Sequence, residues 1–345
     1  MIETFQFRRL FVAGAAGFAV LALLLGAMGT AAAACTNRGD LDSRFCDEDG
    51  DLLADTPTDS GQWLDPETLV FSYTAVEDPS VYVNVFSELM DYIAEKTGRK
   101  VKWYGPESYA AQVESMRSGR LHISGFAAGA TVFGVNLAGF HPVAMMGNMD
   151  GTFRGYNLQL ITHKDSDIKT VQDLKGRKIA HVTPSSNSGN QAPRALFKSM
   201  GIVPDVDYNV TYSGKHDNSI MGVVNRDYDA APIASTVMLR MIERGMFDRS
   251  DIRIVWESDK FPGSAYGYVH NLAPKLQAQV RDALLTFDWK GSGLEKDFGK
   301  RADKFIGVNY KKHWNVLRTI QRANDVVYSQ EALKDLKAGK KKKKK

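Results

Sequence analysis

The sequence predicts an α/β protein of two lobes, each built on a mixed, mostly parallel sheet with flanking helices. Two observations predict this fold. From residue 68 onward, short apolar runs typical of strands alternate with longer segments of helical periodicity, the pattern of parallel sheets covered by helices. This alternation is interrupted near residues 148–156 and again near 256–264, as two extended crossings between lobes would do.

One lobe is therefore expected to be inserted in sequence within the other. We assign residues 62–150 and 257–339 to lobe 1 and residues 151–256 to lobe 2. Lobes of about 100–150 residues are large enough to bury a core. In such α/β units a ligand lies at the carboxyl ends of the strands, and hinge closure traps it.

Lobe 1 is expected to begin with a βαβαβαβ unit. The strand "TLVFSYT" (68–74) is followed by a helix over residues 80–98 that ends at Gly98, because glycine is the usual helix C-cap. The remaining elements are a strand at 100–105, a helix at 107–119, a strand at 121–126, a small-residue helix from Ala128, a strand at 141–147, a strand at 265–271 and helices at 274–287 and 312–328.

Lobe 2 is predicted as a smaller α/β unit. Its elements are a strand within 155–165, a short helix and strand within 170–182, the polar segment 183–197, and two further segments at 224–235 and 252–258.

The first 34 residues form a tripartite export signal, with Arg8 and Arg9, an apolar stretch and the small-residue cleavage site "TAAAA". The apolar stretch is also close to the length of a membrane span, but the Ala-rich exit favours cleavage and a periplasmic or secreted protein. The only two cysteines, Cys35 and Cys46, directly follow. An oxidising compartment favours a disulfide between them, and a lipidated Cys35 is the alternative, for which Ala32 is a poor match.

Residues 35–61 form an acidic N-terminal segment. Asp47, Asp49, Asp51 and Asp55, with Gly50 at the turn, resemble short calcium-binding loops, because calcium prefers several carboxylate oxygens around a tight bend. The full EF-hand spacing ending in glutamate is absent, and most acidic surface loops bind no metal tightly. The question of calcium stays open at this point.

The net charge argues against a nucleic-acid partner. The total of +4 includes +1 from residues 1–34 and +6 from the lysine tail at 340–345, which leaves −3 for residues 35–339. The tail is expected to be a solvated extension outside the fold. No nucleic-acid-reading motif occurs, and no His, Cys or Asp cluster at zinc spacing is found, so no metal or cofactor is assigned.

The segment "TPSSNSGNQAPRALF" (183–197) places several short polar side chains directly before a helical run. Such residues favour helix caps and turns, and a helix N-terminus presents free N–H groups and a positive dipole end to an anion. The segment can be an ordinary cap or an oxyanion site.

Four stretches, in order, resemble one family. They are "EDPSVYVNVFSELMDYIAEKTGRKVKWY", "SYAAQVESMRSGRLHISGF", "TPSSNSGNQAP" and "GKHDNSIMGVVNRDYDAA". Over roughly residues 62–335 the chain is similar to the phosphonate-, phosphite- and phosphate-binding proteins of bacterial ABC importers. The resemblance implies the hinged, type II-like periplasmic binding protein fold and a role in capturing an oxyanion for a permease.

The resemblance also implies site residues. Tyr109 stands where the family has a tyrosine donor, His216 matches a family histidine, and Phe126 falls where some members have tyrosine. The remaining positions match the family's Ser-Thr-Ser-Gly motif, and they are Ser186, Asn187 and Ser188. A protonated His216 would add charge-assisted bonding, with affinity depending on pH near 6.5.

Two departures narrow the expected ligand. Family members for aminoalkyl phosphonates carry carboxylates that hold the ammonium, and the matching positions here are the neutral Thr236 and Ser264. An ammonium buried without a partner is costly, so we expect phosphate, phosphite or a small alkyl phosphonate. The absence of a pocket cysteine argues against trivalent arsenic.

Two other functions are weighed against transport. The same fold can serve as a periplasmic sensor that docks on a histidine kinase, and sequence alone does not separate the two. A serine hydrolase is disfavoured because "SNSGN" lacks the first glycine of the nucleophile elbow. A P-loop is also missing.

Overall fold

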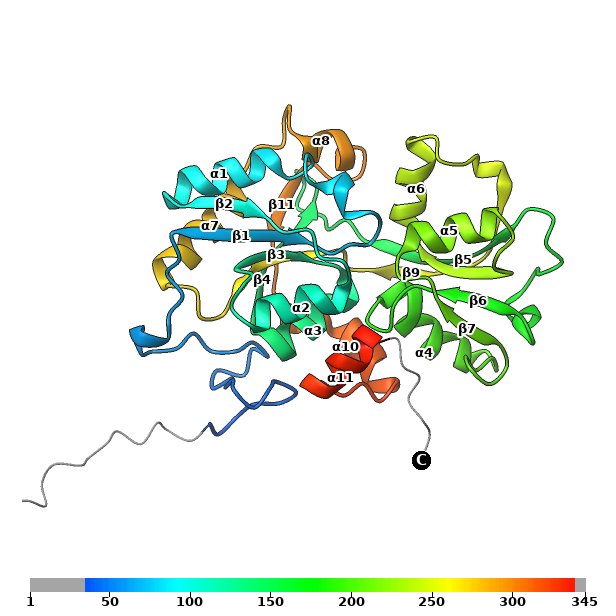
Figure 1. Ribbon diagram of the computed structural model, residues 1–345, viewed down its shortest axis with the longest axis horizontal. Helices are drawn as coiled ribbons and strands as arrows, with labels where there is room; N and C mark the ends of the chain where they lie inside the picture. Colours follow the sequence, from blue (N-terminus) through cyan, green and yellow to red (C-terminus); the bar gives the residue numbers. More distant parts are fainter. Residues whose placement is uncertain (1–34, 339–345) are drawn as a thin grey trace, which may run out of the picture. The chain divides into compact units, whose positions relative to one another are not determined.

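The computed structural model describes residues 35–338, and the part from Thr36 onward forms one compact unit. Two sheets with flanking helices organise this unit (Figure 1). Lobe 1 denotes the part built on the six-stranded sheet and lobe 2 the part built on the five-stranded sheet. Within residues 35–338 no helix is both long and apolar enough to span a bilayer. The expected export signal and the lysine tail lie outside the described residues.

The sheet of lobe 1 has the strand order β11-β4-β10-β3-β1-β2. β1 pairs in parallel with β2 and β3, whereas β10 is antiparallel to β3 and β4, and β11 is antiparallel to β4. β10 starts beside the end of β4, with Ala265 opposite Met145, because the chain returns to lobe 1 near the point where it left. The strands are β1 Thr68–Tyr73, β2 Lys100–Trp103, β3 Ile123–Phe126, β4 Phe140–Gly147, β10 Ala265–Val269 and β11 Lys304–Gly307.

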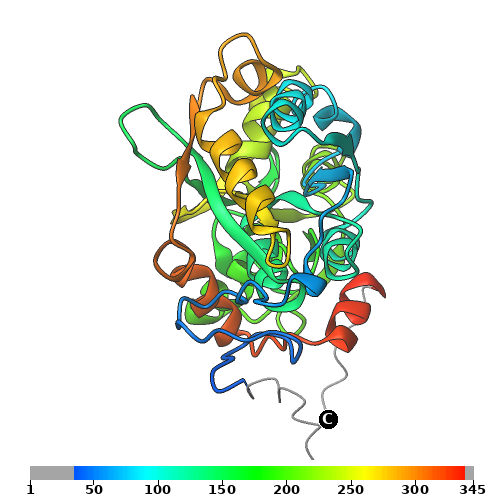
Figure 2. The ribbon, with the colours of Figure 1, turned by 90° about the vertical axis from the view of Figure 1, so that its left-hand side faces the viewer.

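Helices α1 and α7 cover one face of this sheet, and α2 and α3 cover the other (Figures 1 and 2). α1 begins later than expected, after a 3-10 turn at Pro79–Tyr82, and ends at Gly98, whose φ of 67° is the left-handed cap predicted from the sequence. α3 is buried on all sides, which its apolar composition requires. The helices are α1 Ser87–Thr97, α2 Tyr109–Arg117, α3 Ala128–Ala138, α7 Pro274–Thr286, α8 Gly293–Phe298, α9 Tyr310–His313, α10 Asn315–Ala323 and α11 Gln330–Ala338.

The sheet of lobe 2 has the strand order β7-β6-β8-β5-β9. β6 is parallel to β7 and β8, and β5 is antiparallel to β8 and β9. Its elements are β5 Tyr156–His163, β6 Lys178–His181, a π-helical turn at Asn187–Gln191, α4 Ala192–Ser199, β7 Asn209–Tyr212, α5 His216–Val224, β8 Ala230–Ala234, α6 Ser235–Glu243 and β9 Ile252–Phe261.

The two-lobe fold with mixed sheets and flanking helices is confirmed. The sheets are not mostly parallel, although the sequence suggested that they would be, because β5 and β10, the strands next to the crossings, pair antiparallel with their neighbours. β9 stays paired with β5 as far as Phe261, so the sheet of lobe 2 runs past the expected limit at residue 256. The lobe limits otherwise stay a prediction.

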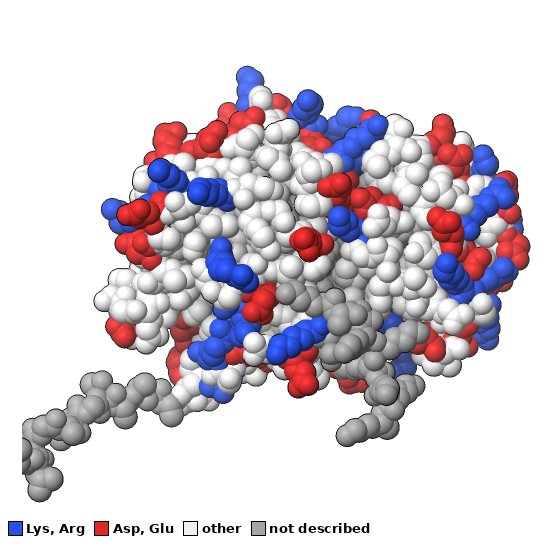
Figure 3. All heavy atoms as spheres, in the orientation of Figure 1, with Lys and Arg blue, Asp and Glu red and all other residues white. Residues whose placement is uncertain are grey.

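The N-terminal segment and the C-terminal helices pack against the lobes. Leu41 and Phe45 are buried in the hydrophobic core, and both cysteines of the described residues are disulfide-bonded, as expected. Near α10, the Asn324 side chain donates to the carbonyl of Gln191 in lobe 2 at 2.8 Å. On the face shown in Figure 3, acidic and basic side chains are interspersed rather than gathered by sign, which agrees with the small net charge of the body.

Candidate ligand-binding site

A cavity of about 260 Å³ is lined by residues from both lobes. Tyr73 ends β1, the segment Ala127–Gly129 follows β3, and Ala234 ends β8, so the carboxyl ends of strands form its walls, where α/β units place ligands. Its polar lining includes, from lobe 1 and the returning crossing, Tyr73, Tyr109 and Ser264 and, from lobe 2, Tyr156, Ser186, Asn187, Ser188, His216, Thr236 and Arg240.

The serine segment forms a tight turn at the start of the π-helical Asn187–Gln191. Ser186 caps this turn, because its hydroxyl oxygen accepts the N–H of Gly189 at 3.1 Å. Ser186, Asn187 and Ser188 are all at least nine-tenths buried and all line the cavity. The sequence offered an ordinary cap and an oxyanion site as alternatives. The structure shows the cap and also places the segment in the cavity lining, and its role in binding stays a prediction.

His216 is a neutral donor rather than a cation. Burial lowers its pKa to about 3, with Glu77 opposing and Arg240 reinforcing the shift, so the ring is uncharged at neutral pH. Its Nδ1 accepts the backbone N–H of Ala234 at 3.2 Å. A neutral imidazole has one N–H, and therefore its proton is on Nε2. This environment disfavours the expected protonated His216, because no carboxylate of the described residues lies within bonding distance to offset the cost of burying a cation.

The tautomer of His216 also orients Ser186. Nε2 lies 3.4 Å from the Ser186 hydroxyl oxygen, so that oxygen is the acceptor for both the imidazole N–H and the Gly189 N–H. A hydroxyl has two acceptor sites and one donor. Since both acceptor sites are used, the O–H of Ser186 is left to donate.

Tyr109, at the start of α2, is 2% exposed and lines the cavity. Its hydroxyl has no hydrogen-bond partner among residues 35–338, although Ser186 is near enough to lower the phenol's pKa. Burial, the largest effect, raises that pKa well above its usual value. The phenol therefore stays protonated, and a buried donor without an acceptor indicates a ligand position.

Tyr156 is a cavity residue that the sequence analysis did not identify. Its hydroxyl accepts a hydrogen bond from the Asn187 amide at 2.9 Å. Burial raises its pKa to about 12, against the lowering effect of Asn187 and Ser188, so its O–H also remains a donor. Tyr156 is distant in sequence from the serine segment, and no local motif indicates their contact.

Phe126 lies outside the cavity lining, which corrects its assignment as a ligand-contacting residue. It is fully buried, and its ring packs edge-to-face on Phe140 with centroids 4.8 Å apart. The preceding Gly125 lies between the rings of Tyr73 and Tyr266, where there is no room for a side chain. Because successive side chains of a strand point to opposite faces of the sheet, Phe126 points away from these two rings. Its ring contributes to the core of lobe 1.

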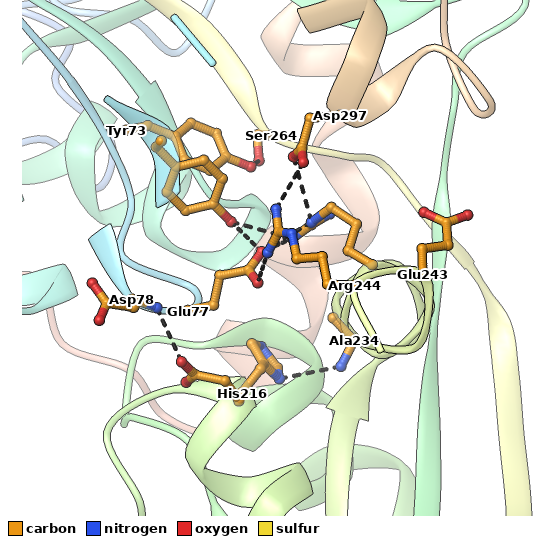
Figure 4. A network of polar contacts seen from close by, with 12 residues as sticks. Tyr73, Glu77, Asp78, His216, Ala234, Glu243, Arg244, Ser264 and Asp297 are labelled. Atoms are coloured by element: carbon orange, nitrogen blue, oxygen red, sulfur yellow. Dashed lines mark hydrogen bonds and ion pairs between the residues drawn. The ribbon is translucent and has the colours of Figure 1, made fainter. Parts of the chain in front are cut away.

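Behind Arg240 of the cavity lining, a network of ion pairs joins the lobes. Glu77, in the loop after β1 of lobe 1, accepts from Arg240 of α6 at 2.6 Å and from Arg244 at 2.7 Å. Arg244 also contacts Asp297 of α8 at 2.7 Å. Figure 4 shows the Glu77 carboxylate pointing toward the guanidinium group of Arg244. The network is therefore assembled from both lobes.

Glu77 is ionised and fully engaged. Burial alone would raise its pKa, but the charge of Arg240, the Tyr82 hydroxyl and Arg244 together lower it below the usual value. Glu77 and Arg240 are 3% and 4% exposed. A carboxylate held by two arginines is not available to a ligand's ammonium group.

The charge of the cavity lining is one-sided. Among the described residues, three arginines line it, Arg154, Arg240 and Arg301, and no aspartate or glutamate does. Thr236 and Ser264 are both part of the lining, and the Ser264 hydroxyl lies 3.0 Å from that of Tyr73. The lining therefore suits an anion that accepts hydrogen bonds.

Comparisons with known proteins identify relatives of this chain. Residues 71–314 match the model of a family described as ABC transporter, phosphonate, periplasmic substrate-binding protein. The phosphate-import protein PhnD of Mycolicibacterium smegmatis is 28% identical over 221 residues, which cover 61% of this chain and 69% of that protein.

Solved structures share the fold. A binding protein component of an ABC phosphonate transporter from Pseudomonas aeruginosa aligns with a TM-score of 0.67 at 21% identity. The aligned region covers 79% of this chain and 94% of that protein. PhnD1 from Prochlorococcus marinus, in complex with methylphosphonate, has a TM-score of 0.66 at 16% identity and covers 76% of this chain and 99% of its own. These likenesses show the two-lobe fold.

Proposed function

The chain belongs to the family of phosphonate ABC transporter periplasmic substrate-binding proteins, and from that premise we propose that it binds a small phosphorus oxyanion between its lobes. The ligand class is phosphate, phosphite or a small alkyl phosphonate. The observation that carries this proposal is the cavity lining, in which neutral donors converge, three arginines are present and no described carboxylate takes part.

The donors act together on a tetrahedral anion. The hydroxyls of Tyr109, Ser186 and Tyr156 all belong to the lining, and the Nε2–H of His216 orients the Ser186 hydroxyl. An anion can be buried without a directly paired countercharge when enough donors replace its water. Because these donors come from both lobes, the complete set exists only while the lobes are closed, so binding is coupled to closure.

The same lining disfavours an aminoalkyl phosphonate. The neutral Thr236 and Ser264 offer no charge to an ammonium group, and Glu77 is held by Arg240 and Arg244. The relatives' own ligands, phosphate import in one case and methylphosphonate in the other, likewise carry no ammonium.

We propose that the loaded protein delivers its anion to the permease of an ABC importer, after export to the periplasm through residues 1–34. The family and the relatives named above favour this role over that of a sensor for a histidine kinase. No covalent step is proposed for this role.

Isothermal titration calorimetry on protein stripped of bound ligand tests the proposal. The panel is phosphate, phosphite, methylphosphonate, aminoethylphosphonate and sulfate. We expect micromolar or tighter binding of at least one of the first three, and binding of aminoethylphosphonate at least about 100-fold weaker, since an unpaired buried charge costs several kcal/mol. Tightest binding of aminoethylphosphonate, or of sulfate, would contradict the proposed ligand class.

A further inference from the structure

The acidic N-terminal segment contains a cluster of carboxylates outside the cavity described above. One carboxylate oxygen from each of Asp47, Asp49 and Asp51 lies within 4.8 Å of the other two. None of these residues lines the large cavity. Three negative charges at this separation repel one another, and a cluster of this kind alone can be a mere surface feature.

Asp47 distinguishes this cluster from an ordinary acidic surface. The residue is 1% exposed, and its Oδ1 atom is buried with no hydrogen-bond partner among residues 35–338. Its other oxygen, Oδ2, accepts the backbone N–H of Leu52 at 3.1 Å. A buried carboxylate oxygen facing two further carboxylates is costly unless a cation or donor reaches it.

The protein supplies no such cation within the described residues. No ion pair there includes Asp47, Asp49 or Asp51. The nearby ammonium of Lys311 donates to the carbonyl oxygen of Gly50 at 2.8 Å, so it binds the loop's backbone.

The spacing of the loop selects calcium among common cations. Counting Asp47 as position 1, aspartates occupy positions 1, 3, 5 and 9, and Leu53 supplies a backbone carbonyl at position 7, the order of ligands in a calcium loop. Leu52, at position 6, has φ of 72°, where such loops place glycine for the sharp turn. Position 12 is Thr58 instead of a bidentate glutamate, which predicts weak affinity.

We propose that residues 47–55 bind one Ca²⁺ ion through the carboxylates of Asp47, Asp49 and Asp51 and the carbonyl of Leu53, with Asp55 acting directly or through water. This site is separate from the anion cavity, and its existence does not depend on the proposed function. The loop is held against lobe 1 by Lys311 and by His141, whose Nε2 contacts the carbonyl of Ala54. Calcium therefore orders the loop that carries these two contacts to lobe 1.

Calorimetric titration of the EDTA-treated, dialysed full-length protein with CaCl₂ tests this inference. We expect one site with a Kd of about 10⁻⁴–10⁻³ M, the range of extracellular calcium modules, and binding of MgCl₂ at least about tenfold weaker. Hydrogen exchange of amides 47–55 should slow when calcium is added, because binding holds the loop closed.

Asp49→Asn and Asp47→Asn should each weaken calcium binding at least about tenfold, since each removes one charged ligand. Asp49 is exposed, so its variant tests the site without risk to the core. Glu48→Gln is the matched control. It removes the same charge one residue away from Asp49, but the Glu48 side chain is bonded to Thr36 and not to the cluster. This variant should change the Kd less than about threefold. Absence of saturable binding at 10 mM CaCl₂, about ten times the weakest expected Kd, equal binding of Mg²⁺, or wild-type affinity in both aspartate variants would overturn the inference.

Discussion

Replacing Tyr109 with phenylalanine removes a single buried hydroxyl and should move stability and ligand affinity in opposite directions. In the ligand-free protein this hydroxyl has no described partner, and an unsatisfied buried polar group costs about 1–3 kcal/mol. Tyr109→Phe is therefore expected to leave the melting temperature unchanged or raise it. Most substitutions of a buried side chain lower it, so the sign of the change is informative.

The loss of affinity follows from the proposed ligand contact. A hydrogen bond to a charged acceptor contributes about 1.5–3 kcal/mol, which corresponds to a Kd about 10- to 100-fold higher in Tyr109→Phe. Calorimetry with the tightest ligand of the panel measures the Kd, and thermal unfolding without ligand measures the stability.

Tyr310→Phe is the matched control for this experiment. Tyr310 is 3% exposed and its hydroxyl also lacks a described partner, but it does not line the cavity. It should show the same neutral or positive effect on melting temperature and no change in Kd. A change in Kd of less than about threefold in Tyr109→Phe, well below the value of a charge-assisted bond, would refute the reasoning.

Three further predictions concern pH, closure and the ion pairs. Burial lowers the pKa of three histidines, His181, His216 and His270, to about 3. Below pH 6.5 the unfolded chain therefore binds more protons than the folded chain, and the unfolding free energy should fall by roughly 3–4 kcal/mol from pH 6 to pH 5. Equal free energies of urea unfolding at pH 5 and pH 8 would contradict this prediction. Gly129→Ala should abolish tight ligand binding while the fold survives, because a Cβ there would lie 2.7 Å from the Asn187 nitrogen of the other lobe and hold the lobes apart. Wild-type affinity by calorimetry would show that the close approach of Gly129 to Asn187 is not needed for binding. Glu77→Gln should weaken ligand binding at least about tenfold and reduce ligand-induced compaction in small-angle scattering, because breaking a buried pair costs about 3–5 kcal/mol. Glu114→Gln, at a more exposed pair away from the cavity lining, should have little effect, and equal behaviour of the two variants would remove the network from closure.

The sequence predicted the features that depend on local patterns. Alternating apolar segments gave two mixed sheets with flanking helices, and Gly98 ended its helix as expected. The serine segment and Tyr109 line one cavity, although their role in binding stays a prediction. These assignments succeed because caps, periodicity and short motifs depend on neighbouring residues.

Features that depend on distant contacts could not be predicted. The charge state of His216 depends on its burial and on the Ala234 N–H, and neither can be read from the polar stretch "SGKHDNS". Glu77 and Arg240 are 163 residues apart in sequence, so nothing local indicates their pairing. Phe126 was misplaced because a resemblance fixes a position on a strand but not the direction in which its side chain points.

The position of the ligand is the central claim, and a crystal structure of the protein with methylphosphonate tests it most directly. We expect the phosphonate oxygens to lie within hydrogen-bond distance of Tyr109 Oη, Ser186 Oγ and the Ser188 segment, with Glu77 still paired to Arg240. A phosphonate bound elsewhere, or bound by one lobe with the Tyr109 hydroxyl unused, would contradict it.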